Sequence, residues 1–136
     1  MGKVLIVDDE KDFLLLVGMF LDAKGVDSEL VESAAQARKL LARTRFDLVI
    51  SDLYMPGESG FDLFRYVSSQ YPEMRFAIMT GSGNSRIKNE ARGMGIDAYI
   101  EKPFSFVDLM QIVKNLAPDC LPEKSLRVGR KAKGVR

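Results

Sequence analysis

Acidic side chains follow two of the short apolar runs in this sequence. Asp8 and Asp9 come directly after residues 4–7, and Asp52 comes just after residues 48–50. If these runs are neighbouring strands, three carboxylates meet at one edge of a sheet and raise one another's pKa unless a cation neutralises them. With one Cys and no His in the chain, oxygen ligands indicate a hard cation. Mg²⁺ suits best, because it accepts one or two carboxylates, keeps bound water and brings phosphate oxygens to a site.

A hydroxyl and an amine follow two further apolar runs. Thr80 lies just after residues 76–79, and Lys102 lies just after residues 99–100. At the same edge of a sheet, these two groups can bind the oxygens of a phosphoryl group, with the lysine acting as a compact point charge. Together with the carboxylates, they predict a site for a divalent cation and a phosphoryl group.

Each of these residues also has an ordinary explanation when it is taken alone. Asp9 could cap the first helix, and Asp52 could lie in a solvated turn. A threonine such as Thr80 is common at a strand end, and a lysine such as Lys102 is usually solvated. The hypothesis of a site therefore depends on all the groups lying at the carboxyl ends of predicted strands, which is much rarer by chance.

Five short apolar runs recur along the chain, and we expect them to be strands. Four are nearly continuous in hydrophobicity, as in strands that are buried on both faces of a parallel sheet. The remaining run is interrupted by Asp27 and Glu29, which an edge strand tolerates. The runs are residues 4–7, 26–31, 48–50, 76–79 and 98–100.

Segments with helical periodicity separate these runs. The first predicted helix has an apolar face and ends at Gly25, the second begins at Ser33 with Gln36 completing a capping box, and Ser105 caps the last. The segment 84–94 is the weakest helix, because it is mostly polar. The expected apolar positions are Phe13, Leu16, Val17, Phe20 and Leu21, then Leu63, Phe64 and Val67, then Ile87, Ala91 and Met94, and finally Leu109, Ile112, Val113 and Leu116.

The alternation of strand and helix, five times over, predicts an α/β fold. We expect a doubly wound, five-stranded parallel sheet of the flavodoxin-like (βα)5 type, with helices on both faces. The common strand order for this fold is 2-1-3-4-5, and ligands bind beyond the carboxyl ends of strands 1 and 3. This order would bring the acidic residues together.

Composition limits the remaining possibilities. The 136 residues are 46% apolar and 29% charged, which is typical of a single folded domain. No apolar run approaches the roughly 20 residues of a membrane span, and the lone Cys120 indicates a reducing compartment, so we expect a cytoplasmic protein. Residues 118–136 hold six basic and two acidic side chains, and we expect them to form a flexible basic tail or linker.

Four motifs, taken in order, resemble those of bacterial two-component response-regulator receiver domains. The motifs are Val7-Asp8-Asp9-Glu10, Asp52-Leu53-Tyr54-Met55-Pro56-Gly57 with Gly60, Thr80-Gly81, and Lys102-Pro103-Phe104. Each is weak alone, but the ordered combination is specific, and the resemblance covers residues 3–117. It implies that residues 1–117 are a receiver domain, a signalling phosphoprotein and not an enzyme.

The resemblance also implies how the phosphoryl group is held. Asp52 would be the phosphoacceptor and form an aspartyl phosphate, which Thr80 would hydrogen-bond and Lys102 would pair with. Tyr99 falls at the position of the family's aromatic switch, which turns inward when Thr80 moves toward the phosphate. The bond between Lys102 and Pro103 resembles the family's cis peptide.

The metal ligands and the residues that control phosphoryl lifetime are implied in the same way. Mg²⁺ would be held by Asp9, Asp52 and the backbone carbonyl of Tyr54, with Asp8 binding it largely through water. In the family, the positions of Tyr54 and Ser82 influence how fast water removes the phosphoryl group. A bulky Tyr54 and an uncharged Ser82 predict slow autodephosphorylation.

The partners follow from this interpretation. The phosphoryl donor would be a sensor histidine kinase, a His-phosphotransfer protein or a small acyl phosphate. The surface formed by helix 4 (residues 84–94), strand 5 (residues 98–100) and helix 5 (the last helix, which Ser105 caps) would then signal to a downstream effector or output domain. The sequence leaves open whether phosphorylation also drives homodimer formation. Residues 118–136 contain no helix-turn-helix pattern, so no intrinsic DNA-binding domain is predicted, although a contact of the tail with nucleic acid or an acidic partner stays an alternative.

Three other interpretations compete with this one. Flavodoxin shares the chain order, but its phosphate loop needs donors for an anion, and an acidic run at residues 8–10 would repel one. A haloacid-dehalogenase-type phosphatase needs a second Asp two residues after the nucleophile, where this chain has Tyr54. The third alternative is a non-phosphorylated pseudo-receiver that acts only as a protein-interaction module.

Overall fold

The computed structural model describes residues 2–81 and 84–122, in which strands and helices alternate along the chain. The strands are β1 (Lys3–Val7), β2 (Asp27–Val31), β3 (Leu48–Asp52), β4 (Arg75–Thr80) and β5 (Ala98–Glu101). The helices are α1 (Lys11–Ala23), α2 (Ala34–Leu41), α3 (Gly60–Gln70), α4 (Ser85–Met94), α5 (Phe106–Leu116) and the short 3₁₀ helix η1 (Pro118–Cys120). Among the described residues, no helix combines the length and hydrophobicity needed to cross a membrane.

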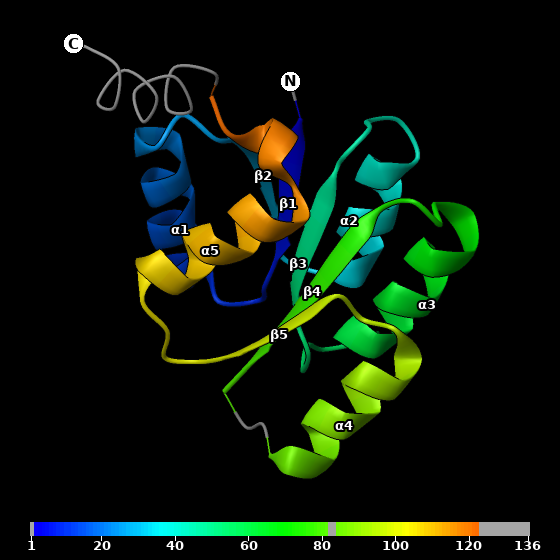
Figure 1. The fold of residues 1–136 in the computed structure, drawn as a ribbon. Helices are drawn as coiled ribbons and strands as arrows, with labels where there is room; N and C mark the ends of the chain where they lie inside the picture. Colours follow the sequence, from blue (N-terminus) through cyan, green and yellow to red (C-terminus); the bar gives the residue numbers. More distant parts are fainter. Residues whose placement is uncertain (1, 82–83, 123–136) are drawn as a thin grey trace, which may run out of the picture.

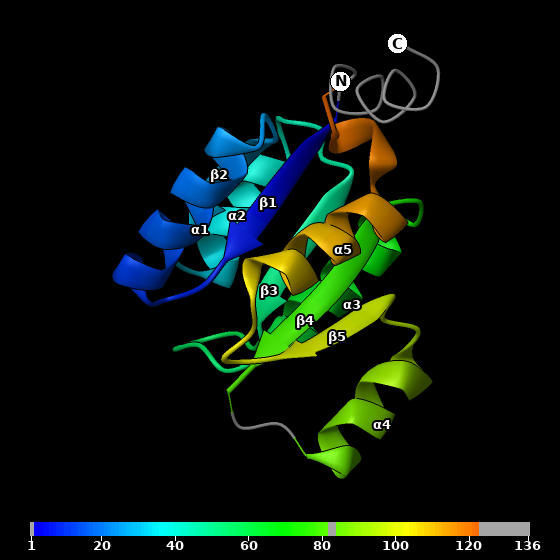
Figure 2. The same cartoon turned by 60° about the vertical axis from the view of Figure 1, so that its left-hand side comes forward.

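All five strands are parallel and lie in the order β2-β1-β3-β4-β5 (Figure 1). Figures 1 and 2 show α1 and α5 on one face of the sheet and α2, α3 and α4 on the other. The predicted α/β class, doubly wound architecture and strand order are therefore confirmed. The charged run 26–31 is the edge strand β2, as its interrupted pattern indicated.

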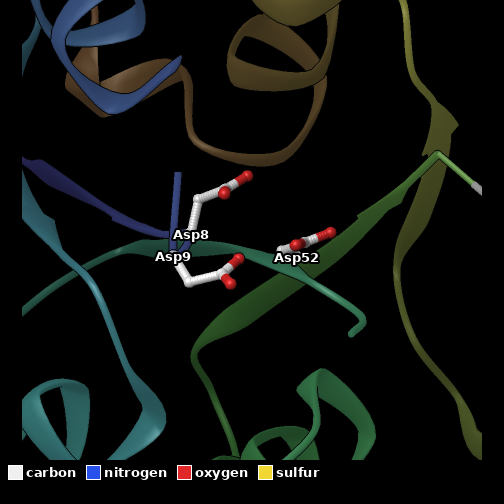
Figure 3. A group of neighbouring side chains, drawn as sticks. All are labelled: Asp8, Asp9 and Asp52. Carbon is white, nitrogen blue, oxygen red and sulfur yellow. The ribbon is translucent and has the colours of Figure 1, made fainter. Parts of the chain in front are cut away.

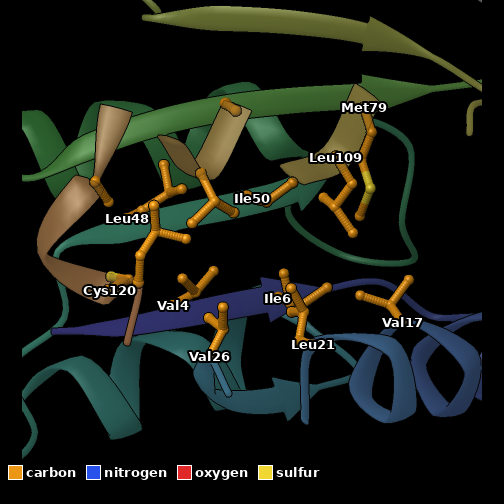
Figure 4. Packing of buried hydrophobic residues seen from close by; sticks show 14 of the residues in the cluster. Val4, Ile6, Val17, Leu21, Val26, Leu48, Ile50, Met79, Leu109 and Cys120 are labelled. Carbon is orange, nitrogen blue, oxygen red and sulfur yellow. The ribbon is translucent and has the colours of Figure 1, made fainter. Parts of the chain in front are cut away.

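The central strands are buried on both faces because their side chains alternate between two apolar layers. Val4 and Ile6 of β1 pack with α1 and α5, in the cluster that Figure 4 shows. Leu5 and Val7 of the same strand belong to the cluster on the other face, which also contains residues of α2, α3 and α4. Because both faces are buried, successive residues of these strands are all apolar in the sequence. The packing on both faces also fixes the carboxyl ends of the strands side by side at one edge of the sheet.

Local signals place most of the helix ends. Ser105 accepts a hydrogen bond from the amide of Asp108 and completes a capping box at the start of α5, and Ser33 caps α2. Gly25 follows α1 with φ of 76°, a left-handed conformation that glycine adopts at little cost. The segment 84–94 does form α4, with Ala91 as its one buried residue.

Two expectations about packing were wrong. Leu16 was expected on the buried face of α1 but is 57% exposed, while Leu14 is buried instead. Five consecutive apolar residues, 13–17, are compatible with more than one buried face of the helix. Residues 118–122, expected as the start of a flexible tail, instead begin with η1, and Cys120 and Leu121 pack into the core beside α5. The rest of the predicted tail lies outside the described residues.

Candidate functional site

The predicted acidic residues converge where β1 and β3 end (Figure 3). These strands are hydrogen-bonded neighbours, so Asp8, directly after β1, lies near Asp52, the last residue of β3. Asp8, Asp9 and Asp52 each offer a carboxylate oxygen, and these oxygens lie within 4.8 Å of one another. Asp8 and Asp52 are buried and Asp9 is exposed. The structure therefore brings the three predicted carboxylate ligands into one cluster.

Lys102 provides positive charge to this cluster from the loop after β5. Its Nζ atom lies 2.6 Å from Asp8 Oδ2, 3.4 Å from Glu10 Oε1 and 3.7 Å from Asp52 Oδ1. The side chain is only 16% exposed, and its Nζ atom lies over the ring of Phe13. The peptide bond between Lys102 and Pro103 is cis, as expected.

Asp8 is held by two hydrogen bonds that use both of its carboxylate oxygens. Oδ1 accepts from the backbone amide of Glu10, at 2.9 Å, and Oδ2 accepts from Lys102 Nζ. Asp9 does not cap α1, since the N-cap residue is Glu10, whose side chain makes no cap hydrogen bond. The capping explanation for Asp9 therefore does not apply, and its exposed carboxylate faces the cluster.

The environment of Asp52 raises the pKa of its carboxyl group from 3.8 to about 6. Burial is the largest cause, and the negative charge of Asp8 adds to it, while Lys102 acts in the opposite direction. Burial also lowers the pKa of Lys102, but the hydrogen bond to Asp8 and the nearby carboxylates outweigh it and raise that pKa overall. The cluster thus has an excess of buried negative charge, which a divalent cation would neutralise.

The raised pKa of Asp52 predicts a specific dependence of stability on pH when no divalent cation is present. Between about pH 4 and pH 6 the folded state holds more protons than the unfolded chain, so stability falls as the pH rises. We expect Asp52 to account for a loss of about 2 kcal/mol in the free energy of unfolding between pH 4 and pH 7. Urea denaturation in EDTA measures it, and Asp52→Asn is the matched control, which should lack this loss. Equal pH profiles for the two proteins would contradict the prediction.

Thr80 and Tyr99 lie on the two strands beyond β3. Thr80 is the last residue of β4 and is buried, and its backbone carbonyl accepts a hydrogen bond from the amide of Lys102. Tyr99 of β5 lies beside Ile78 of β4. Its hydroxyl oxygen is buried and has no hydrogen-bond partner among the described residues. Burial and the nearby charge of Glu101 raise the pKa of this hydroxyl.

The remaining predicted residues are placed less fully. Tyr54 follows β3 on the loop before α3, and its side chain is 54% exposed. Ser82 lies outside the described residues. Gly60, the first residue of α3, lies so close to the end of β3 that a Cβ atom there would be 2.4 Å from the carbonyl oxygen of Asp52. A glycine at this position allows α3 to start directly behind the acidic cluster.

Two side chains around Lys102 were not predicted as site residues. Glu10 lies in the acidic run but was given no role, and its side chain reaches the ammonium group. Phe13 was expected only as an apolar position of the first helix, yet Lys102 Nζ lies 4.3 Å from the centre of its ring. Glu10 and Phe13 follow Asp9 by one and four residues, so the sequence places both near the start of α1. Nothing in the sequence linked them to Lys102.

Known proteins share both the sequence pattern and the fold. Residues 4–114 match the family model of the response regulator receiver domain. The response regulator protein PilR of Pseudomonas aeruginosa is 33% identical over 111 residues, which are 82% of this chain and 25% of PilR. FleR of the same organism is 35% identical over 121 residues, 89% of this chain and 26% of that protein. The chain thus spans about a quarter of the length of these curated relatives.

A solved structure of TrrA from Thermotoga maritima, described as a complex with Mg²⁺ and BeF, has a similar fold. It is 28% identical, covers 85% of this chain and 99% of its own, and superposes with a TM-score of 0.77.

Proposed function

This chain belongs to the response regulator receiver domain family, and from that premise we propose that Asp52 accepts a phosphoryl group in a Mg²⁺-dependent reaction. The observation that carries this proposal is the convergence of three carboxylates within 4.8 Å, with the ammonium group of Lys102 3.7 Å from Asp52. A carboxylate nucleophile, acidic ligands for a cation and a fixed positive charge are what phosphoryl transfer to an aspartate requires.

The donor set fits Mg²⁺, because it consists of oxygen atoms with no nitrogen or sulfur ligand in the cluster. Asp9, Asp52 and the backbone carbonyl of Tyr54 are the proposed direct ligands. Asp8 already uses both oxygens in hydrogen bonds, which supports a contact through water. When bound, Mg²⁺ neutralises the negative charge that would otherwise repel an incoming phosphate.

The chain's own residues account for the transfer step. A carboxylate oxygen of Asp52 attacks the phosphorus, a new P–O bond forms, and the bond from phosphorus to the donor's imidazole nitrogen or acyl oxygen breaks. Lys102 compensates the charge of the transferring oxygens, and the hydroxyl of Thr80 donates to one of them. Catalysis is then positioning and electrostatic stabilisation rather than proton transfer.

We propose that the phosphoryl group is read out at the surface formed by α4, β5 and α5. The added charge of ≈ −1.5 to −2 would draw Thr80 toward the phosphate and change the packing of Tyr99. Two observations support this: the Tyr99 hydroxyl is buried without a described partner, and α4 has a single buried residue, Ala91. A helix with so little buried surface can shift at low cost.

Receiver domains are signalling modules, and this one is proposed to act between two proteins. The phosphoryl donor would be a sensor histidine kinase or a His-phosphotransfer protein, and we propose that the signalling takes place in the cytoplasm. The recipient of the signal would be a downstream effector protein or an output domain. Relatives such as PilR are response regulators about four times as long as the matched segment.

Phosphorylation itself is testable with a small donor. Purified protein is incubated with acetyl phosphate, with Mg²⁺ or with EDTA, and its intact mass is measured. We expect a gain of one phosphoryl group that depends on Mg²⁺. Absence of any gain, also with a histidine-phosphorylated donor protein, would contradict the proposal and favour the alternative of a non-phosphorylated interaction module.

Tyr54 provides a prediction about phosphoryl lifetime. Its large side chain follows Asp52 by two residues and is proposed to shield the phosphorus from attacking water. We expect Tyr54→Asn to shorten the lifetime of the phosphorylated protein by about tenfold, which corresponds to a decrease of about 1.4 kcal/mol in the barrier to hydrolysis. Decay of the phosphorylated form after removal of acetyl phosphate gives the rate, and Tyr71→Asn, a change at the C-terminal end of α3, is the control. An unchanged lifetime would contradict shielding.

A further inference from the structure

The ammonium group of Lys102 has acids on one side and an aromatic ring on another. Asp8 accepts a short hydrogen bond from it at 2.6 Å, and Glu10 accepts a longer one at 3.4 Å. Asp52, at 3.7 Å, is beyond hydrogen-bond distance. The centre of the Phe13 ring is 4.3 Å from Nζ, within the range in which the negative face of a ring attracts a cation.

The Phe13 ring is itself held in place. Phe13 lies in the first turn of α1, and its ring meets Phe104 edge-to-face, with centroids 5.9 Å apart and an interplanar angle of 88°. Phe104 follows Lys102 and Pro103 in the loop after β5. The ring and the ammonium group therefore belong to one packed unit that joins α1 to this loop, and both line the same apolar hollow, together with Leu16.

We propose that Phe13 is a positioning residue for Lys102, an inference that rests on the phosphoacceptor function proposed above. An ammonium group has three N–H donors, and the carboxylates of Asp8 and Glu10 engage two. The ring attracts the cation without accepting a conventional hydrogen bond, so the third donor stays available for the phosphoryl group on Asp52. A carboxylate or amide at position 13 would compete for that donor, and an aliphatic side chain would not attract the charge.

Fluorinated phenylalanines test this role without changing the packing greatly. Each added fluorine weakens the negative potential on the face of the ring while its shape is nearly kept. Phenylalanines that carry one, two or three ring fluorines are incorporated at position 13 by nonsense suppression. We expect phosphorylation of Asp52 by acetyl phosphate to become slower with each added fluorine. Phe13→Leu should be slower than wild type by about three- to tenfold, which lies between the effects of an exposed and a fully desolvated cation–π contact. Phe13→Tyr should lose less.

Phe20 provides a matched control on the same helix. Its ring stacks on Phe106, with centroids 4.3 Å apart. Lys24 Nζ lies 5.8 Å from the ring centre, and Lys24 is the C-cap of α1, at the opposite end of the helix from Phe13. The same fluorine series at Phe20 should leave the phosphorylation rate unchanged. In a Lys102→Ala background the series at Phe13 should also have no effect, because the cation is gone.

The outcomes separate this inference from the function on which it rests. A graded loss at Phe13 that needs Lys102, with unchanged urea denaturation midpoints, supports the positioning role. If the wild type is phosphorylated but the fluorines at position 13 leave the phosphorylation rate unchanged, only the role of Phe13 is overturned. The same holds if fluorines at position 20 slow phosphorylation as much as those at position 13. A wild type that gains no phosphoryl group overturns the phosphoacceptor function and this inference with it.

Discussion

Asp52→Asn is expected to abolish the phosphoryl gain that acetyl phosphate and Mg²⁺ produce in the wild type. The amide is nearly the same size as the carboxylate but lacks its charge and nucleophilic oxygen, and it is also a weaker ligand for Mg²⁺. Loss of the nucleophile in covalent catalysis lowers rates by roughly 10⁴-fold or more, which places the variant below detection in an intact-mass measurement over the same period.

A control must show that the loss of phosphorylation does not follow from removing a carboxylate elsewhere in the protein. Asp119→Asn provides the control, because Asp119 lies in η1, near Gly2 at the amino end of the sheet. This variant should be phosphorylated at the wild-type rate. If Asp52→Asn still gains a phosphoryl group with Mg²⁺, another side chain is the acceptor and the assignment of Asp52 is wrong.

Lys102→Ala is expected to have the second largest effect, a reduction of the phosphorylation rate by about 10²- to 10³-fold. This is the range measured when one preorganised group that stabilises developing charge is removed. The ammonium group lies 3.7 Å from Asp52 and is mostly buried, so water and buffer ions replace it poorly. Phosphorylation rates at saturating Mg²⁺ give the comparison with the wild type.

The same substitution leaves Asp8 buried without its ion-pair partner, which is expected to cost a few kcal/mol of stability. Circular dichroism at each Mg²⁺ concentration separates this effect from the loss of rate. Lys3→Ala is the matched control, since Lys3 also pairs with a carboxylate, Glu29, at 3.4 Å, but at the amino end of β1. A rate for Lys102→Ala within threefold of Lys3→Ala would contradict the proposed role.

The fold could be predicted in most of its parts because its signals are local or periodic. Continuous apolar runs indicated strands buried on both faces, and the alternation with helices limited the sheet to a few orders. The convergence of Asp8 and Asp52 followed from that order alone. By contrast, the buried face of α1 was wrong at Leu16, since consecutive leucines satisfy several helix orientations and only packing against α5 and β2 selects one.

Contacts between side chains far apart in the sequence were beyond such reasoning. Lys102 was expected at the same edge of the sheet as the acids. That its ammonium group donates a hydrogen bond to Asp8 and not to Asp52 depends on the geometry of side chains that lie 94 residues apart in the sequence. Phe13 was missed for the same reason. The packing of Cys120 and Leu121 was missed because a short, proline-flanked segment carries no periodicity, although its apolar side chains cover the end of the core.

The most direct test of the central claim is to locate the phosphoryl group chemically. An aspartyl phosphate, unlike a phosphoester, is reduced by borohydride to homoserine, which tandem mass spectrometry of proteolytic peptides identifies by position. After treatment with acetyl phosphate and Mg²⁺, we predict homoserine at position 52, and none there when EDTA replaces Mg²⁺. Homoserine at another aspartate, or intact aspartate at position 52 in protein that carries a phosphoryl group, would contradict the account.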